Sequence, residues 1–201
     1  MQYNTTFTGI ILAGGKSSRL GRDKGLVEWQ GRKIVEFVIE VLSPFCAEVL
    51  ISSNNLEYKQ FSHRVVPDLL PGNGPMMGLY SALRSSSTNM NLVLAVDNIL
   101  VTHAFYSYLL SKDLTKSWIA VPLIGDRFYE PLVGFYKTDC IQVMESMMKE
   151  GNYKLPDLIS DVPSIKLPVE TDFPDYHPNY FQSLNRPEDL VLLKDLPPAR
   201  F

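Results

Sequence analysis

The chain has 201 residues, of which 45% are hydrophobic and 20% charged, and its formal net charge is -3. A chain of this length can bury roughly 70% of its unfolded surface, which is enough for one core. No stretch approaches the ~20 apolar residues of a membrane-spanning helix, and the N-terminus lacks a signal-peptide pattern. We therefore expect one domain over residues 1–201, cytoplasmic and without a membrane partner, as a monomer or weak homo-oligomer.

Apolar runs alternate with stretches of helical periodicity along the chain. The expected strands are 6–13, 48–52, 63–67, 91–96, 118–123, 131–136 and 164–169. The expected helices are 33–42, 75–84, 102–111 and 140–149, the third capped by Thr102 and the fourth by Asp139. Continuously apolar strands that alternate with helices predict an α/β, Rossmann-like three-layer fold around a mostly parallel central sheet.

The two cysteines, Cys46 and Cys140, lie far apart in the sequence and outside any metal-ligand spacing. Disulfides are rare in reducing compartments, where isolated cysteines usually stay as thiols. We expect both to be free, buried thiols in a reducing cytoplasm.

A glycine-rich basic segment follows the first expected strand, running Leu-Ala-Gly-Gly-Lys-Ser-Ser-Arg-Leu-Gly-Arg-Asp-Lys-Gly from Leu12 to Gly25. Glycines let the backbone approach an anion closely, and consecutive N–H groups form an anion-binding concavity. Residues 14–33 hold six Lys or Arg against two Asp or Glu, although the whole chain is negative. The positive charge is local, which suits a small polyphosphate better than nucleic acid. A tight turn alone explains the glycines but not the cations.

Two familiar phosphate-binding patterns do not fit this segment. The P-loop pattern G-x-x-x-x-G-K-[ST], with Lys16 as its lysine, needs a glycine where Ile10 stands. The dinucleotide pattern G-x-G-x-x-G fails because Gly14 and Gly15 are adjacent and the next glycine is Gly21. The segment therefore indicates a nucleotide site of another kind.

The segment does fit the pattern L-x-G-G-x-S-x-R-[ML]-G-x-D-K. The matching residues are Leu12, Gly14, Gly15, Ser17, Arg19, Leu20, Gly21, Asp23 and Lys24. On this basis the chain resembles the molybdenum cofactor guanylyltransferases (molybdopterin-guanine dinucleotide synthases), which are MobA-like nucleotidyltransferases. The resemblance implies a Rossmann-like fold of the nucleotide-diphospho-sugar transferase type. Relatives that use CTP or make sugar nucleotides typically carry alanine at the position of Gly15, so the double glycine favours guanine.

The resemblance also implies a set of site residues and Mg²⁺ as cofactor. The implied nucleotide-binding residues are Leu12, Ala13, Gly14, Gly15, Lys16, Lys24, Ser52, Asp68 and Asp97. The implied catalytic residues are Arg19, Lys24 and Asp97. Lys16 would join Arg19 and Lys24 in holding the triphosphate and stabilising the departing pyrophosphate.

Asp97 follows the apolar run 91–96, so it is expected at the carboxyl end of a strand, where ligands bind in parallel sheets. Mg²⁺ takes one or two carboxylates and completes its shell with phosphate oxygens and water. Asp97 could therefore bind Mg²⁺; the alternative is that it belongs to an Asp-Asn turn that only ends the strand. By resemblance Asp97 is the metal ligand, but the family continues with an apolar residue or Thr, then Pro and an aromatic. This chain has Asn98-Ile99-Leu100 instead, and Asn98 offers a second oxygen.

Two further segments resemble nucleotide-contacting elements of the family. Asp68 precedes a Gly-Pro-x-x-Gly element that ends at Gly78, and the resemblance assigns Asp68 to nucleotide binding. An aspartate in a proline-rich turn is the alternative. Ser52 and Asn54 fall where the family has an Asn-x-Asn-like segment that meets the base, with Ser52 in place of the first asparagine.

The acceptor side is assigned by resemblance alone. Residues 181–190 resemble F-x-N-x-N-T-P-E-[ED]-L, in which Asn185 keeps the second asparagine and Ser183 replaces the first. Asn185 is equally a candidate helix cap, because Glu188 completes a capping box three residues later. Pro131 matches a family segment on the acceptor side.

The resemblance implies transfer of GMP from GTP to the phosphate of molybdopterin or molybdenum cofactor, with release of pyrophosphate. The acceptor phosphate is already anionic, so positioning and charge neutralisation would carry the catalysis. Two alternatives stay open. One is a nucleotidyltransferase of the same fold that uses CTP or a sugar phosphate. The other is a weakly active GTP-binding regulator, motivated by Ser183 and by the altered turn after Asp97.

Overall fold

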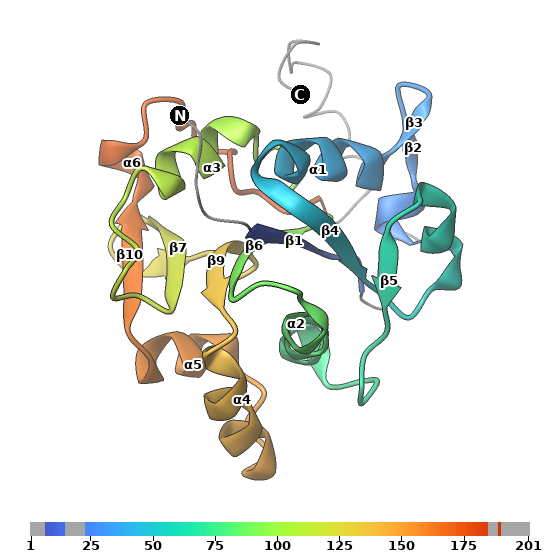
Figure 1. Cartoon of the computed structure of the whole chain (residues 1–201). Coiled ribbons are helices and arrows are strands. Elements are labelled where there is room, and N and C mark those ends of the chain that lie inside the picture. Colours follow the sequence, from blue (N-terminus) through green and yellow to red (C-terminus); the bar gives the residue numbers. More distant parts are fainter. Residues whose placement is uncertain (1–6, 15–22, 185–188, 190–201) are drawn as a thin grey trace.

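A mixed sheet forms the centre of the computed structural model, which describes residues 7–14, 23–184 and 189 (Figure 1). Its strands are β1 (Phe7–Leu12), β4 (Cys46–Ser52), β5 (Arg64–Val66), β6 (Met90–Ala95), β7 (Ile119–Ile124), β8 (Phe128–Tyr129), β9 (Val133–Lys137) and β10 (Ser164–Pro168). Seven of them follow the order β10-β7-β9-β6-β1-β4-β5, and β8 pairs with β7. A separate hairpin joins β2 (Glu28–Trp29) to β3 (Arg32–Lys33).

The strands in this order run in one direction, with the exception of β9. β1 is parallel to β4 and β6, β4 is parallel to β5, and β7 is parallel to β10. β9 is antiparallel to both of its neighbours, β6 and β7. The expected mostly parallel sheet is therefore confirmed. Because β9 is reversed, its first residues lie at the edge of the sheet where the parallel strands end.

Helices cover both faces of the sheet (Figure 1). One face carries α1 (Ile34–Leu42), α3 (His103–Leu110) and α6 (Val169–Asp172), and the other carries α2 (Gly74–Ser85), α4 (Cys140–Lys149) and α5 (Leu155–Asp161). Side chains of β1 alternate between two apolar cores, Phe7 and Ile11 in one, Ile10 and Leu12 in the other. Each such burial stabilises the fold by roughly 1.5–3 kcal/mol. The predicted three-layer α/β fold is confirmed.

The expected strands and long helices are all present, with ends within about two residues of those predicted. Residue 6, the expected start of the first strand, lies outside the described residues. The sequence analysis missed β2, β3, β8, α5, α6 and three 3₁₀ helices, η1 (Lys24–Leu26), η2 (Ser43–Phe45) and η3 (Leu56–Phe61). These elements are too short to show a hydrophobic period.

The two predicted helix caps were wrong in their bonding. Thr102 stands at the N-cap position of α3 with an extended backbone, but its side chain makes no capping hydrogen bond. Its hydroxyl instead bonds the hydroxyl of Tyr180 at 2.7 Å. Asp139 precedes α4 with an already helical backbone (φ -54°, ψ -27°), which departs from the extended conformation that a capping carboxylate needs. The residue types predicted two capping hydrogen bonds, but Thr102 bonds Tyr180 instead and the backbone of Asp139 is already helical.

The two cysteines are free, as expected, but only Cys140 is buried, whereas Cys46 is half-buried. The pKa of each thiol is raised to about 12, and burial is the main cause in both cases. Neither thiol is therefore reactive at neutral pH.

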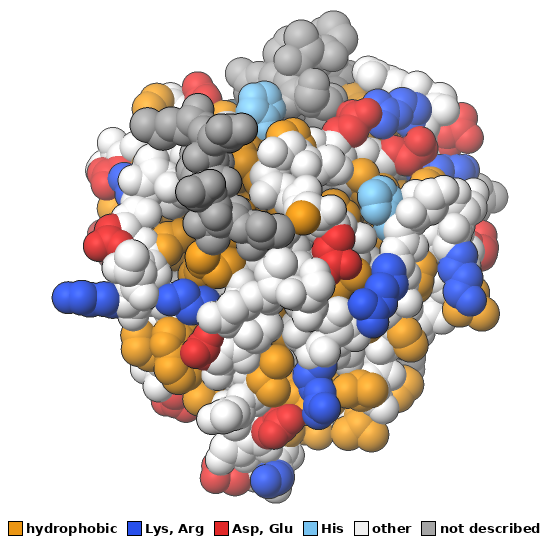
Figure 2. Space-filling model, viewed as in Figure 1, with side chains coloured by type: hydrophobic (Ala, Val, Ile, Leu, Met, Phe, Trp, Pro, Cys, Tyr) orange, Lys and Arg blue, Asp and Glu red, His pale blue; other side chains and the backbone are white. Residues whose placement is uncertain are grey.

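The surface carries charges of both signs. On the face shown in Figure 2, basic and acidic side chains of the described residues are interspersed, with apolar side chains between them. Within the described ranges, no helix is both long enough and apolar enough to cross a membrane.

Candidate active site

The order of the strands creates a switch point beside β1. The chain places β4 and β5 on one side of β1 and then crosses to β6 on its other side. Leu12 at the end of β1 pairs with Ala95 at the end of β6, and the Val96 N–H donates to the Leu12 carbonyl at 3.0 Å. Ligands of α/β sheets bind in the crevice beyond such carboxyl ends. Gly14 and Asp97 continue the chain from these two strand ends.

An ion pair bridges this switch point. The ammonium group of Lys24 lies 2.9 Å from Oδ2 of Asp97, and the two side chains are 21% and 23% exposed. The structure thus brings together two of the three predicted catalytic residues, which are 73 positions apart in sequence. A lysine and a carboxylate that are both partly exposed offer adjacent sites for an anionic oxygen and for a metal ion.

Lys24 is positioned by the aspartate that precedes it. Asp23 Oδ1 accepts hydrogen bonds from the Gly25 N–H at 3.2 Å and from the Tyr58 hydroxyl at 2.5 Å, while Oδ2 accepts from Asn55 Nδ2 at 3.2 Å. Burial, and then Asp23, raises the pKa of the Tyr58 hydroxyl, so it stays protonated and continues to donate. Asp23 therefore fastens η1 to η3. Sequence reasoning missed Tyr58 and Asn55, because neither belongs to a local pattern.

Gly25 is required by packing rather than by backbone conformation. A Cβ atom at this position would overlap the Tyr58 hydroxyl and would lie 2.8 Å from Cγ2 of Val96. Tyr58 is fully buried and Val96 is also buried, so neither side chain can move aside easily. The absence of a side chain at Gly25 lets η1 approach the strand end that carries Asp97.

A second group of predicted residues gathers around Gly78 on α2. Asn54 and Asp68 form a paired contact, in which Asn54 Nδ2 donates to Asp68 Oδ2 and the Asp68 N–H donates to Asn54 Oδ1, both at 2.9 Å. The hydroxyl of buried Ser52 donates to the Gly78 carbonyl at 3.1 Å. A Cβ on Gly78 would lie 3.0 Å from Ser52 Oγ, 3.4 Å from Asp68 Oδ1 and 3.7 Å from Leu12 Cδ2. Ser52 thus holds α2 against β4, while Asp68 stays partly exposed.

Glu130 is a site residue that the sequence analysis did not assign. It precedes β9, and its Oε1 accepts a hydrogen bond from the Leu132 N–H at 3.2 Å. Burial raises its pKa to about 7, and the charge of Asp97 adds to this rise, whereas the Leu132 hydrogen bond acts in the opposite direction. The only signal in the sequence was its neighbour Pro131, which the structure places at the same edge. The site thus holds a second carboxylate within electrostatic reach of Asp97.

Four predicted site residues lie outside the described residues. They are Gly15, Lys16, Arg19 and Asn185. Their roles stay predictions.

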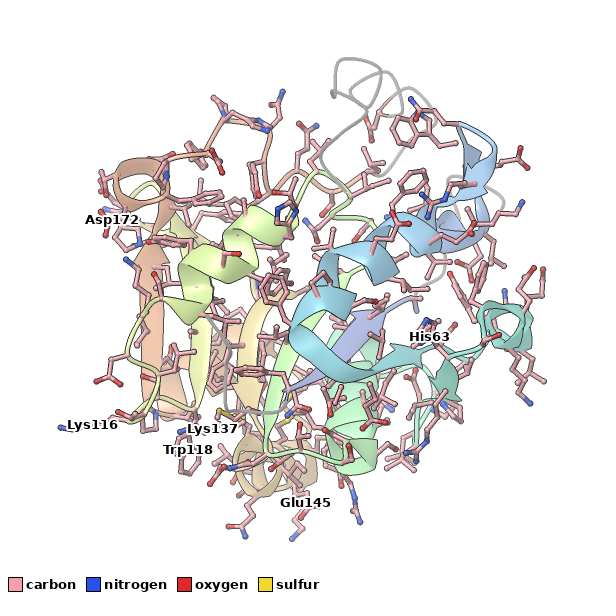
Figure 3. All side chains as sticks on the ribbon, turned by 45° about the horizontal axis from the view of Figure 1, so that its top comes forward. His63, Lys116, Trp118, Lys137, Glu145 and Asp172 are labelled. Carbon is pink, nitrogen blue, oxygen red and sulfur yellow. The ribbon has the colours of Figure 1, made fainter. Side chains whose placement is uncertain are left out.

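The opposite edge of the sheet carries a hollow of about 300 Å³ at the amino ends of β4 and β5, lined by residues 43, 46–49 and 62–64. His63 belongs to this lining and is labelled in Figure 3 together with Trp118 and Lys137, which are neighbours because the Lys137 N–H donates to the Trp118 carbonyl at 2.8 Å. None of the predicted site residues that the structure describes lines the hollow. The ion pair and the Asn54–Asp68 contact lie instead toward the edge where the parallel strands end.

Comparisons with known proteins bear on both the family and the fold. The model of the MobA-like NTP transferase domain matches residues 9–165. A probable molybdenum cofactor guanylyltransferase of Flavobacterium johnsoniae is 31% identical over 185 residues, which cover 92% of this chain and 96% of the relative. One from Pyrococcus horikoshii is 32% identical over 195 residues, with coverage of 91% and 96%.

Two solved structures share the fold. Molybdopterin-guanine dinucleotide biosynthesis protein A from Archaeoglobus fulgidus superposes with a TM-score of 0.77 at 23% identity, covering 92% of this chain and 96% of that one. The 2-C-methyl-D-erythritol 4-phosphate cytidylyltransferase of Thermus thermophilus gives 0.65 at 16% identity, with coverage of 91% and 95%. At these identities the likeness concerns the fold alone, and it confirms the expected fold type.

Replacement of Gly25 by Ala should destabilise the protein and disturb the ion pair. The added methyl group overpacks the contact between η1, Tyr58 and Val96, which costs about 1–3 kcal/mol in the free energy of unfolding. Urea unfolding measures this loss. Tyr58→Phe removes the oxygen that the methyl group meets, so the Gly25→Ala change should cost less in a Tyr58→Phe background. Equal costs in both backgrounds would show that this overlap is not the cause.

Glu130→Gln should change how stability depends on pH. In the folded protein the carboxyl keeps its proton up to about pH 7, whereas in the unfolded chain it loses the proton near its ordinary value of 4.5. The free energy of unfolding of the wild type therefore falls as pH rises through this window. The variant avoids this loss. The difference in the free energy of unfolding, variant minus wild type, should therefore be about 2 kcal/mol larger at pH 8 than at pH 4, after allowance for partial exposure.

Urea unfolding of both proteins between pH 4 and pH 8 tests this expectation. The matched control is Glu150→Gln, because Glu150 is an exposed carboxylate at the end of α4. The control should keep the wild-type pH dependence. If Glu130→Gln also keeps it, then Glu130 does not hold a proton in the folded state.

Proposed function

The chain belongs to the MobA-like NTP transferase family, and we propose that it transfers GMP from GTP to the terminal phosphate of molybdopterin or molybdenum cofactor. The observation that carries this proposal is the Lys24–Asp97 ion pair at the carboxyl ends of β1 and β6. The relatives named as probable molybdenum cofactor guanylyltransferases, at 31% and 32% identity over nearly their whole length, support the choice of reaction.

Mg²⁺ is the cofactor that we propose for this site. Among the described residues, no group of three or more His, Cys, Asp and Glu side chains is placed to hold a metal ion. The partly exposed carboxylate of Asp97, with Glu130 near it, instead offers the small oxygen donor set that suits Mg²⁺, whose remaining ligands are phosphate oxygens and water. Bound there, the ion would neutralise charge on the triphosphate and offset the charge that develops at the α-phosphorus.

The protein's own groups would act by positioning and neutralisation. An oxygen of the acceptor phosphate forms a bond to the α-phosphorus of GTP while the bond from that phosphorus to the bridging oxygen breaks, and pyrophosphate leaves. Lys24 would hold an anionic oxygen of the triphosphate beside Asp97. Lys16 and Arg19, which lie outside the described residues, would neutralise the departing pyrophosphate. No side chain needs to act as a nucleophile.

Guanine is the base that we propose, with the paired Asn54 and Asp68 beside the ligand. The side chain of Asp68 is partly exposed, and a carboxylate oxygen there would accept hydrogen bonds from N–H donors of a nucleoside. We place the reaction in the reducing cytoplasm, where the two free thiols would persist, without a nucleic-acid or membrane partner.

Lys24→Ala and Asp97→Asn should each lower turnover by about 10²–10³-fold, because each removes a charge that stabilises the transition state. The assay follows pyrophosphate release from GTP with Mg²⁺ and isolated molybdopterin. Arg84→Ala is the matched control, since it breaks an exposed ion pair between Arg84 of α2 and Glu145 of α4 (3.4 Å), neither of which is a predicted site residue. The control should keep turnover within twofold of wild type.

Competition among GTP, CTP and UTP in the same assay tests the choice of base. Excess unlabelled GTP should suppress the reaction of labelled GTP, whereas CTP and UTP should not. A preference for CTP would reassign the chain to a pyrimidine-using transferase of the same fold. Tight GTP binding without pyrophosphate release would instead support a regulator.

A further inference from the structure

The turn that follows Asp97 is fastened to a distant segment of the chain. Asn98 is only 1% exposed, and its Nδ2 donates to the Phe181 carbonyl at 3.0 Å and reaches Ser183 Oγ at 3.4 Å. The Leu184 N–H donates to the main-chain carbonyl of Asp97 at 2.9 Å. Residues 181–184 therefore lie directly against Asp97 and Asn98, the second and third residues after β6.

The same segment is attached again at the other end of the turn. The buried hydroxyl of Tyr180 accepts a hydrogen bond from the Thr102 N–H at 3.0 Å and bonds the Thr102 hydroxyl at 2.7 Å. The ring of Phe181 packs edge-on against Phe105 of α3, with centroids 5.2 Å apart. Residues 180–184, here called the clamp segment, thus bridge the turn from Asp97 to Thr102.

The contact between Asn98 and the clamp segment acts on the main chain rather than on a ligand. Asn98 is buried and its Nδ2 is bonded to the clamp segment, so its side chain acts here on other parts of the protein. Its own backbone only closes the turn, with the Asn98 N–H donating to the Ala95 carbonyl at 3.0 Å. What its side chain fixes is the position of the main chain next to Asp97.

We propose that Asn98 is a positioning residue for the nucleotidyl transfer, which ties the clamp segment to the turn and thereby holds the Asp97 carboxylate in place for a divalent cation. The proposal rests on the proposed function. Mg²⁺ demands near-ideal octahedral geometry, so a loosely held carboxylate binds it less well. Groups that orient a metal ligand typically account for 10–100-fold in metal affinity.

Asn98→Ala is the direct test. The variant should bind Mn²⁺, used as a paramagnetic substitute for Mg²⁺, about tenfold more weakly in the presence of GTP, as measured by electron paramagnetic resonance. The Mg²⁺ concentration that gives half-maximal turnover should rise by a similar factor. The KM for GTP at saturating Mg²⁺ should stay within about twofold, because the proposal assigns Asn98 to the carboxylate that binds the cation and not to the base or the ribose.

Asn91→Ala is the matched control, because Asn91 is also a buried asparagine whose Nδ2 donates to a main-chain carbonyl. Asn91 is fully buried at the amino end of β6, its Nδ2 donates to the Tyr136 carbonyl at 3.1 Å, and its Oδ1, like that of Asn98, has no hydrogen-bond partner among the described residues. Both variants should lose similar stability in urea unfolding. Only Asn98→Ala should change Mn²⁺ affinity.

Two results would overturn the proposal: unchanged Mn²⁺ affinity in Asn98→Ala, or an equal loss in Asn91→Ala. If Asn98→Ala does not fold, Tyr180→Phe loosens the same clamp segment at Thr102 and should weaken Mn²⁺ binding about two- to fivefold. Wild-type affinity in Tyr180→Phe would then count against the proposal. If wild-type protein itself binds Mn²⁺ and GTP but releases no pyrophosphate, the proposed function fails while the clamp can still be judged from Mn²⁺ affinity.

Discussion

The ion pair between Lys24 and Asp97, at 2.9 Å, is the contact on which the arrangement of the site depends. It forms because β1 stands between β4 and β6, so that the segment after β1 and the end of β6 meet at one edge. The close approach of η1 then requires glycine at position 25, and Asp23 fixes η1 against Tyr58. Lys24 thus lies beside Asp97 because of the strand order, the absence of a side chain at Gly25 and the buried hydroxyl of Tyr58.

Much of this could be predicted from local sequence. Continuously apolar strands and the periodic apolar positions of helices about ten residues long can be recognised from local sequence alone. The sheet and its layers were therefore predicted correctly. The positions of Leu12 and Asp97 at strand ends followed from the same patterns, and parallel strands bring such ends together. The family assignment rested on the glycine-rich segment, and the match over residues 9–165 confirms it.

The rest depends on contacts that no local pattern encodes. Glu130 joins the site because β9 is reversed, and strand direction was not predictable from its apolar run alone. Tyr58 reaches Asp23 from a 3₁₀ helix that has no hydrophobic period. Thr102 is a residue type that often caps helices and has the extended backbone of a cap, but its hydroxyl bonds the Tyr180 hydroxyl instead of the helix. In each case a partner far along the chain decides the role.

The turn after Asp97 shows how two local departures can have one physical explanation. Asn98 and Ser183 both depart from the family pattern, and separately each weakens the match to an active enzyme. In the fold they are neighbours, with Asn98 Nδ2 3.4 Å from Ser183 Oγ and 3.0 Å from the Phe181 carbonyl. A proline would restrict this turn through its fixed φ angle, whereas here side-chain hydrogen bonds to the clamp segment restrict it from outside. The main chain at Asp97 and Asn98 is thus restricted by hydrogen bonds to the clamp segment and not by a proline in the turn.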